Sequence, residues 1–306
     1  MTSTIKTRAS LSIVCPVSNM SGRLQRLEKW VALLQPNKSI QIIIVHDCQD
    51  IPTGKELMEL FSSLPNVLFI EGYYGNPGSA RNAGMHLANR DWVCFWDSDD
   101  QPEVENFLEM IDEGEKNNSD ICIGHFLKID ESQSKPSLEN SWTGEESVND
   151  FIFSMNPGIW RMCFRNSLIQ HQQFHAFRMA EDQIFSAEAF SRADNISYFG
   201  KSVYTYFIGT NLQLTSNKGA MSDLQYSFAV MLNLLEKSPN KRSRNVISIM
   251  AARQFITGLR KIQFSTKVQL LKFFILWILR ASNEYKLIMV HSFLKIIRNW
   301  KNYYGR

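Results

Sequence analysis

The sequence predicts an α/β fold with a mostly parallel sheet, followed by a helical region. Short β-rich runs alternate with amphipathic helical stretches from residue 11 to residue 129. Carboxylates follow two of the predicted strands, and from residue 221 the pattern is helical to the end. With 306 residues, 44% of them hydrophobic, the chain is long enough to bury a large core.

The elements of this sheet are read from residue type and periodicity. Predicted strands are rich in β-branched and aromatic residues, and predicted helices repeat apolar residues every three or four positions. The predicted strands are 11–17, 40–46, 67–71, 92–96, 120–129, 160–164 and 203–208. The predicted helices are 23–34, 55–64, 79–88, 103–116 and 183–192. Residues 130–150 are polar and predict a mobile loop at the edge of the site.

The most informative cluster is Asp97, Ser98, Asp99 and Asp100, directly after the apolar run 92–96. Two like charges about 4 Å apart repel by about 1 kcal/mol in water and about 4 kcal/mol at an effective dielectric of 20. The cluster therefore needs a positive partner, and a hard divalent cation is the usual one. Side chains alternate along a strand, so Asp97 and Asp99 point to one side and Ser98 to the other. A solvated loop is the alternative.

Asp100 has a second interpretation. With Glu103 three residues later and Pro102 between them, it forms the pattern of a capping box at the start of the helix 103–116. We therefore expect Asp100 to cap a helix, and we assign the cation to Asp97 and Asp99.

Charge divides the chain into an acidic front and a basic tail. Residues 237–306 carry 15 Lys or Arg and one acid, Glu284, whereas residues 1–236 carry 18 basic and 29 acidic residues. The five cysteines lie far apart without a C-x-x-C pair, which indicates reduced core thiols of a cytosolic protein. Residues 1–8 are polar, so neither a signal peptide nor a membrane-spanning helix is expected there.

Two common nucleotide-binding motifs are missing. The sequence has no G-x-x-x-x-G-K-[ST], and no G-x-G-x-x-G follows the first strand. Their absence argues against a P-loop NTPase and a dinucleotide-dependent dehydrogenase.

Four segments, in this order and spacing, resemble the nucleotide-binding half of the family 2 glycosyltransferases, which have the GT-A fold. They are the strand Leu11–Val17, the strand Ile42–Asp47, the segment Asn76–Gly84 and the cluster Asp97–Asp100. A weaker similarity continues to Glu181-Asp182-Gln183. The resemblance implies a GT-A domain over residues 1–215, with a donor half at about 9–102 and an acceptor half at about 103–215. A basic helical region follows at 216–306.

On the donor side, the resemblance implies that Asp47 contacts the nucleotide base and that Arg81, in the segment S-A-R-N, lies on the nucleotide side. It places Asp97 by the ribose and sugar and Asp99 on Mg²⁺ or Mn²⁺, with Asp97 as a second ligand. A turn-forming Asp47 and a surface salt bridge of Arg81 are the alternatives. The sequence also departs from the family, because His46 replaces the usual first Asp. The complete predicted nucleotide-sugar site is Pro16, Asp47, Arg81, Asp97, Ser98 and Asp99.

On the acceptor side, Glu181 and Asp182 match the family's E-D motif. The resemblance implies that Asp182 is the base that accepts the proton of the incoming hydroxyl. The alternative for Asp182 is a helix N-cap. Trp160 and Arg161 match a region that often lines the acceptor pocket, although Trp160 fits a core position equally well.

The basic tail contains two predicted amphipathic helices, 268–279 and 287–300. The first apolar run is shorter than the roughly 20 residues needed to cross a bilayer. Basic amphipathic helices can lie in the interface of an anionic membrane, so we expect residues 237–306 to contact a membrane surface. Packing against the acidic front of the chain is the alternative. No nucleic-acid recognition motif accompanies the charge.

Taken together, the resemblance implies an inverting glycosyltransferase. It would move one sugar from a nucleotide-diphosphate sugar to a hydroxyl of a glycan or polyprenyl-linked glycan in bacterial surface polysaccharide synthesis. The chain lacks the Q-x-x-R-W motif of processive synthases, which favours single-sugar addition. We expect a cytoplasmic protein, peripheral on the inner face of the membrane. The alternatives are a non-catalytic sugar-nucleotide or glycan-binding module and a metal-dependent nucleotidyltransferase.

Overall fold

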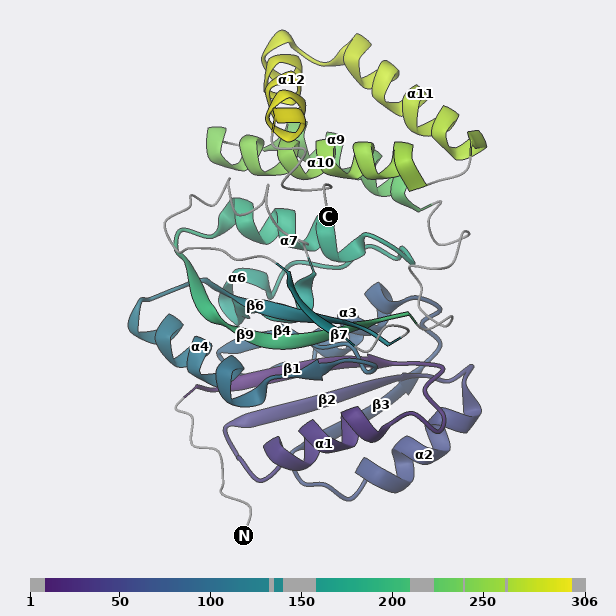
Figure 1. The fold of residues 1–306 in the computed structure, drawn as a ribbon, viewed down its shortest axis with the longest axis vertical. Coiled ribbons are helices and arrows are strands. Elements are labelled where there is room, and N and C mark those ends of the chain that lie inside the picture. The colour runs from purple at the N-terminus through teal and green to yellow at the C-terminus, as the bar shows by residue number, and fades with distance from the viewer. Residues whose placement is uncertain are drawn as a thin grey trace. The chain divides into compact units, whose positions relative to one another are not determined.

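The structure is a computed structural model that describes residues 9–131, 135–139, 158–209, 223–238, 240–261 and 264–298. Within these residues, nine strands form one mixed sheet in the order β3-β2-β1-β4-β8-β6-β9-β5, and β7 pairs with β6 (Figure 1). The strands are β1 (Leu11–Val17), β2 (Ile40–Asp47), β3 (Val67–Gly72), β4 (Trp92–Phe95), β5 (Gln101–Pro102), β6 (Ile121–Asp130), β7 (Lys135–Glu139), β8 (Met162–Arg165) and β9 (Ile196–Ile208).

Helices connect these strands and continue after them. They are α1 (Gln25–Leu34), α2 (Ile51–Phe61), α3 (Pro77–Met85), α4 (Val104–Lys116), η1 (Ile159–Arg161), α6 (Asn166–Ile169), α7 (Glu181–Arg192), α9 (Leu224–Lys237), α10 (Lys241–Lys261), α11 (Phe264–Arg280) and α12 (Asn283–Arg298). The predicted alternation of strands and helices is confirmed. Helix α2 begins four residues before its predicted start, because Asp50 caps it by accepting the backbone N–H of Thr53.

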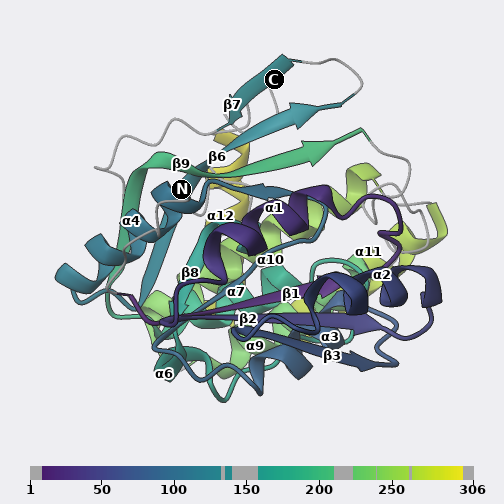
Figure 2. The ribbon, with the colours of Figure 1, turned by 90° about the horizontal axis from the view of Figure 1, so that it is seen from below.

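The predicted parallel sheet is one half of the observed one. Strands β3, β2, β1 and β4 run parallel. The side chains of β1, β2 and β4 are mostly apolar and buried because helices cover both faces, whereas the edge strand β3 is partly exposed. The other half is mixed. Strand β8 is antiparallel to both β4 and β6, and β6 runs parallel to β9 with a register shift around His125. Figure 2 shows β6, β7 and β9 extending side by side.

The two faces of the parallel half bury alternate residues of each strand. On one face, Ile13 and Cys15 of β1 join a core cluster that includes Trp30 of α1 and Phe107 of α4. On the other face, Val14 of β1 packs against α3, which approaches closely at a glycine. Figure 2 shows α1 and α3 on opposite sides of β1 and β2. The strands are therefore held from both sides, which fixes where their ends lie.

One loop prediction needs correction. Residues 130–150 were expected to form a mobile loop, but residues 135–139 form strand β7, which pairs antiparallel with the end of β6. The polar composition concealed this strand, because an edge strand beside β6 needs few apolar residues. Residues 132–134 and 140–150 lie outside the described residues.

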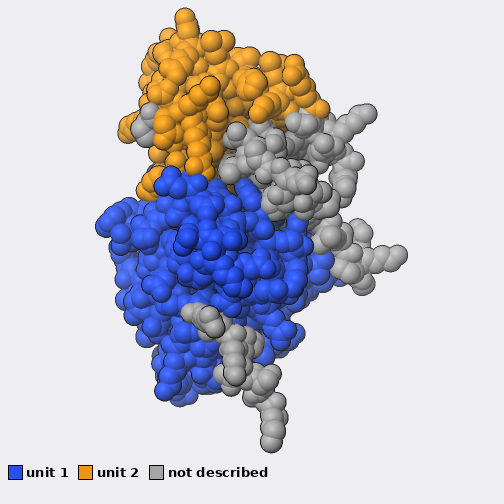
Figure 3. Space-filling model, turned by 90° about the vertical axis from the view of Figure 1, so that its left-hand side faces the viewer, with its two compact units in different colours: residues 1–144, 158–176, 193–210 blue, residues 145–157, 177–192, 211–306 orange. Residues whose placement is uncertain are grey.

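The chain forms two compact units (Figure 3). Unit 1 comprises residues 1–144, 158–176 and 193–210, and unit 2 comprises residues 145–157, 177–192 and 211–306. Helix α7 thus belongs with the C-terminal helices, whereas the predicted boundary at residue 215 assigns it to the first domain. Unit 2 buries apolar side chains of α9 and α10 in its own core, for example Phe228 and Ala251.

The cysteines of the chain lie mostly in its core. All five cysteines are free, and all but Cys48 are buried. Burial raises the pKa of the Cys15 and Cys94 thiols well above the usual value. Among the helices that the structure describes, none is both long enough and apolar enough to cross a membrane.

Candidate active site

The candidate site in unit 1 lies where β1, β2 and β4 end. These strands are parallel, so their carboxyl ends meet at one edge of the sheet, and ligands of α/β sheets bind at such edges. Pro16 is the penultimate residue of β1 and pairs with Val45, and Asp47 is the last residue of β2. Asp97 follows the end of β4 by two residues. The fold therefore brings Pro16, Asp47 and Asp97 to the same edge.

Arg81 is paired with the carboxylate of Asp97. Its Nη2 donates a hydrogen bond of 2.8 Å to Asp97 Oδ1. The Arg81 side chain is only 6% exposed, so the pair is not the surface salt bridge considered from sequence. Helix α3 presents Arg81 because Asn76 caps its start by accepting the backbone N–H of Ser79 at 2.8 Å, and Pro77 fits its first turn. This contact orients the Asp97 carboxylate.

Burial alternates through the acidic cluster. Asp97 and Asp99 are partly exposed, whereas Ser98 and Asp100 are buried. Burial, together with the negative charge of Asp97, raises the pKa of the Asp99 carboxyl to about 6. Burial is the larger cause and the charge of Asp97 the smaller one, and both disfavour ionisation of Asp99. The assignment of a cation to Asp97 and Asp99 stays a prediction.

Two arginines beside Asp99 were not identified from the sequence. Arg23 lies just before α1 and Arg26 lies in its first turn. The positive charges of both arginines act to lower the pKa of Asp99. Arg26 Nη1 also donates a 2.8 Å hydrogen bond to the Asp99 backbone carbonyl, and its guanidinium lies 3.5 Å from the centre of the Phe207 ring. No local motif marks these contacts, since Arg26 is distant in sequence from both partners.

The capping prediction for Asp100 is wrong. Helix α4 begins at Val104 with Glu103 at its N-cap position, and no side chain caps it. Asp100 is instead buried, and its Oδ1 accepts the backbone N–H of Phe207 in β9 at 2.9 Å. Burial and the charges of Asp99 and Asp97 raise its pKa well above the usual value. Asp100 therefore anchors the acidic loop to β9.

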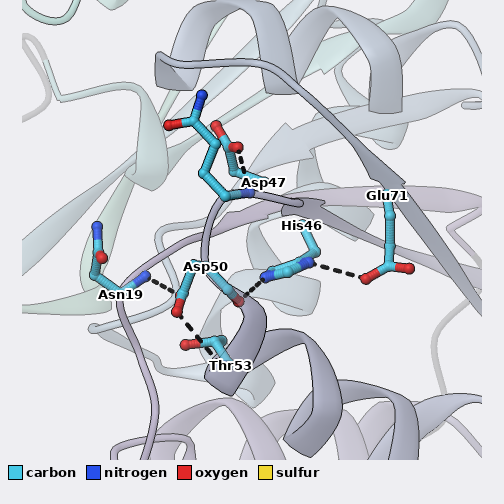
Figure 4. Close-up of polar contacts among 7 residues, drawn as sticks. Asn19, His46, Asp47, Asp50, Thr53 and Glu71 are labelled. Atoms are coloured by element: carbon cyan, nitrogen blue, oxygen red, sulfur yellow. Dashed lines mark hydrogen bonds and ion pairs between the residues drawn. The ribbon is translucent and has the colours of Figure 1, made fainter.

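Asp47 organises the turn after β2. Its Oδ2 accepts the backbone N–H of Gly75 at 2.7 Å. Its Oδ1 accepts the backbone N–H of Gln49 at 3.2 Å, the contact drawn as the dashed line from Asp47 in Figure 4. Gly75 has φ +67°, a conformation that favours glycine. The turn-forming interpretation of Asp47 thus describes its contacts, and its role toward a nucleotide base stays a prediction.

The preceding His46, which departs from the family pattern, is a structural residue. Its side chain is buried, with Nδ1 3.1 Å from Glu71 Oε1 and Nε2 donating to the Asp50 carbonyl at 2.9 Å (Figure 4). Asp50 in turn accepts backbone N–H groups from Asn19 and Thr53. His46 therefore ties β2 to β3 and to the start of α2, below the edge where Asp47 lies.

The structure places Trp160 and Arg161 in the core of unit 1. The Trp160 ring is 5% exposed and stacks on Tyr204, with ring centroids 4.6 Å apart. The Arg161 guanidinium is fully buried, 5.0 Å from the centre of the Phe126 ring. Core packing accounts for the positions of both residues, and their acceptor-side role stays a prediction.

Glu181 and Asp182 begin α7, in unit 2. Asp182 lies in the first turn rather than at the N-cap, and its Oδ1 accepts the N–H of Gln183 at 2.8 Å. The preceding Ala180 has φ +66°, which is strained for a residue with a Cβ. Its carbonyl accepts a hydrogen bond from Ser227 Oγ of α9 at 3.3 Å. The C-terminal helices therefore hold the turn that carries these acids.

The family follows from comparison with known proteins. The model of Glycosyl transferase family 2 matches residues 12–184, more than half of the chain. The chain belongs to this family. The resemblance inferred from the four sequence segments is thereby confirmed, and the match ends within α7, just after Glu181 and Asp182.

Curated relatives of this family-2 chain include two poly(ribitol-phosphate) glycosyltransferases. The poly(ribitol-phosphate) beta-glucosyltransferase of Bacillus spizizenii is 27% identical over 206 residues, which is 65% of this chain and 32% of the relative. The poly(ribitol-phosphate) beta-N-acetylglucosaminyltransferase TarP of Staphylococcus aureus is 27% identical over 215 residues, 68% of this chain and 64% of TarP. The chain thus spans about a third of the first relative and less than two thirds of the second.

Solved structures support the same fold. The crystal structure of S. aureus TarS 1-349 in complex with UDP-GlcNAc has a TM-score of 0.69 at 17% identity and covers 97% of this chain and 93% of its own. The mannosyltransferase PcManGT from Pyrobaculum calidifontis, in complex with GDP-Man and Mn²⁺, has a TM-score of 0.51 at 10% identity. This match covers 98% of the present chain and 88% of PcManGT. The predicted GT-A fold with a helical C-terminal region is confirmed.

The acidic cluster of this family-2 chain fits a divalent cation. Within the described residues, no three or more His, Cys, Asp or Glu side chains gather into a metal cluster. Mg²⁺, however, is commonly bound by one or two carboxylates together with substrate phosphates and water. Asp97 and Asp99 supply two such carboxylates, and a cation beside them would offset the burial and the charge of Asp97 that disfavour ionised Asp99.

Proposed function

We propose that this chain is an inverting glycosyltransferase that moves a single sugar from a nucleotide-diphosphate sugar to a hydroxyl of a glycan or polyprenyl-linked glycan, in bacterial surface polysaccharide synthesis. The observation that carries the proposal is the pair Asp97 and Asp99 at the carboxyl edge of a family-2 sheet, with buried Arg81 bonded to Asp97. The relatives named above act on poly(ribitol-phosphate), and the TarS structure holds UDP-GlcNAc. Both support a nucleotide sugar donor and a polymer acceptor.

On the donor side, Asp97 and Asp99 would hold Mg²⁺ or Mn²⁺, which stabilises the negative charge that develops on the leaving diphosphate. Arg81 keeps the Asp97 carboxylate oriented, so that this residue is preorganised before a donor binds. Arg23 and Arg26 add positive charge beside Asp99, where the donor phosphates would lie. Pro16, Asp47 and Ser98 complete the nucleotide-sugar site.

On the acceptor side, Asp182 accepts the proton of the acceptor hydroxyl as that oxygen bonds to the anomeric carbon and the bond to the diphosphate breaks. One displacement on the face opposite the leaving group inverts the configuration of the anomeric carbon. Glu181, Trp160 and Arg161 are proposed to shape the acceptor side. We further propose that the enzyme works at the cytoplasmic face of the membrane, where polyprenyl-linked glycans would be presented to it.

A donor assay tests this function. The purified chain is incubated with UDP- and GDP-sugars and a glycan acceptor, with and without Mn²⁺, and release of the nucleoside diphosphate is measured. We expect Mn²⁺-dependent turnover that Asp99→Asn abolishes. Asp91→Asn is the matched control, because Asp91 is an exposed carboxylate at the opposite end of β4 and its loss should leave turnover unchanged.

The alternatives give different results in the same assay. Binding of a nucleotide sugar without any turnover, with or without a glycan acceptor, would identify a non-catalytic binding module. Release of pyrophosphate from a nucleoside triphosphate and a sugar phosphate would identify a nucleotidyltransferase. Either result would overturn the proposed transfer reaction.

A further inference from the structure

The two last helices each carry a stripe of exposed apolar residues. On α11 the stripe is Phe264, Val268, Leu271, Ile275 and Leu279, and on α12 it is Leu287, Val290, Leu294 and Ile297. Successive members are three or four residues apart, so each stripe runs along one face of its helix. Every one of these side chains is at least 41% exposed. We call the two stripes together the outer apolar surface.

These helices have a second apolar side that is buried. Leu270 and Trp277 of α11 and Met289 and Ile296 of α12 are at most 2% exposed. One side of each helix therefore packs in the core of unit 2. The outer apolar surface lies on a different side of each helix and is not needed for this packing. A surface helix normally carries polar residues on the side away from the core. Contiguous exposed apolar surface indicates an interaction site.

Positive charge lies among these apolar residues. Lys272 follows Val268 by four residues and Arg298 follows Leu294 by four, which places each cation beside an apolar neighbour on the same helix. The six basic residues of α11 and α12 are Lys267, Lys272, Arg280, Lys286, Lys295 and Arg298. The single acid, Glu284, accepts a hydrogen bond from Arg244 of α10. The two helices that carry the outer apolar surface are therefore strongly cationic.

The positive charge of α11 and α12 favours an anionic partner over a second copy of the chain. Two copies of the chain joined through this surface would bring like charges together, which opposes association. An anionic bilayer has the complementary charge and an apolar interior that takes up Val, Leu, Ile and Phe side chains. No described helix can cross a membrane, so contact would be in the plane of the interface.

We propose that the outer apolar surface docks onto an anionic lipid bilayer, with α11 and α12 lying in the interface and their cations at the lipid headgroups. The membrane contact predicted for residues 237–306 is thereby limited to α11 and α12, because most apolar side chains of α10 are buried in the core of unit 2. The docking involves none of the residues assigned to sugar transfer and does not depend on that assignment.

Vesicle sedimentation of the 306-residue chain tests the proposal. The chain is mixed with phosphatidylcholine vesicles with or without phosphatidylglycerol, at low and high salt. We expect the wild type to sediment only with the anionic vesicles, and less so at high salt. The double variant Leu271→Ser, Ile275→Ser should weaken this binding by about tenfold, because it removes apolar side chains that enter the interface. The charge variant Lys272→Glu, Arg280→Glu should abolish the salt-sensitive part of binding.

The matched control uses exposed apolar residues on a different helix. Ile51 and Met58 of α2 are 64% and 50% exposed, so Ile51→Ser, Met58→Ser should leave vesicle binding unchanged. Circular dichroism checks that every variant is folded. Equal binding by the α11 variant and the wild type would overturn the proposal, as would wild type that sediments with neither vesicle. Self-association that the α11 variant abolishes would instead identify a second copy as the partner.

Discussion

Replacing Gly84 by alanine tests how α3 supports the donor side. In most helices this change is stabilising, by about 0.8–1.0 kcal/mol. Gly84, however, is buried in the last turn of α3, where an added Cβ would lie 2.4 Å from Val14 Cγ1 and 2.9 Å from Val45 Cγ2. Carbon atoms in contact prefer about 3.5–4.0 Å, so the helix must move away from the sheet by about 1 Å.

Such overpacking costs about 1–3 kcal/mol, which exceeds the gain in helix propensity. We therefore expect Gly84→Ala to lower the free energy of unfolding by about 1 kcal/mol. Arg81 lies one turn earlier on the same face of α3, and its 2.8 Å bond to Asp97 would stretch with the helix. A shift of about 1 Å takes that bond beyond the roughly 3.2 Å limit of a good hydrogen bond. Donor affinity should fall as well.

Urea unfolding and titration with a nucleotide sugar measure both effects. Gly200→Ala in β9 is the control, because an added Cβ there meets no atom within 4 Å. Its free energy of unfolding should equal that of the wild type or exceed it by up to about 1 kcal/mol, because alanine limits the unfolded chain without a clash. If Gly84→Ala is more stable than the wild type and binds the donor equally well, the packing argument is refuted.

Three further variants test other parts of the structure. Asp99→Asn should remove the increase in melting temperature that Mn²⁺ and a nucleotide sugar give the wild type, and an undiminished increase would contradict the metal assignment. Asp182→Ala should lower kcat by about 10²–10⁴-fold with nucleotide affinity unchanged, and near-normal turnover would exclude Asp182 as the base. Burial raises the pKa of Glu115, but hydrogen bonds from Arg165 and Trp92 outweigh it and hold the pKa below 4.5. A carboxyl whose pKa is lower in the native state than in the unfolded state stabilises the fold at pH values above its unfolded-state pKa. This stabilisation is lost as the pH falls through the native-state pKa. Glu115→Gln should therefore cost less than about 1 kcal/mol at pH 7, and a cost that persists in acid would contradict this origin.

The parallel half of the sheet could be predicted because its signals are local. Strand β1 coincides with its predicted range, and β2, β3 and β4 differ from theirs by a single residue at one end. Strands β1, β2 and β4 are covered on both faces, so they read as nearly continuous apolar runs. The resemblance added the order of the motifs, and it drew attention to Arg81 and Asp99 before their surroundings were known.

What the sequence could not predict depends on distant partners. Asp100 matched a capping box, yet its carboxylate bonds to Phe207, 107 residues later. Arg26 reaches Asp99 across 73 residues, and nothing near Arg26 in sequence announces that contact. The early part of β9, residues 196–202, was missed because its partly exposed side chains lack a clear alternation. Long-range hydrogen bonds, rather than local pattern, decide these positions.

The grouping of α7 with the C-terminal helices has a consequence for exchanging parts between relatives. Unit 2 takes residues 145–157 and 177–192, the chain then leaves it to form β9, and it returns at residue 211. Ser243 Oγ of α10 donates to the Ser191 carbonyl at 2.9 Å, so both ends of α7 are bonded to helices that come later in the sequence. A chimera that replaces only residues 211–306 would leave α7 packed against a foreign surface. The three stretches of unit 2, residues 145–157, 177–192 and 211–306, should therefore be exchanged together.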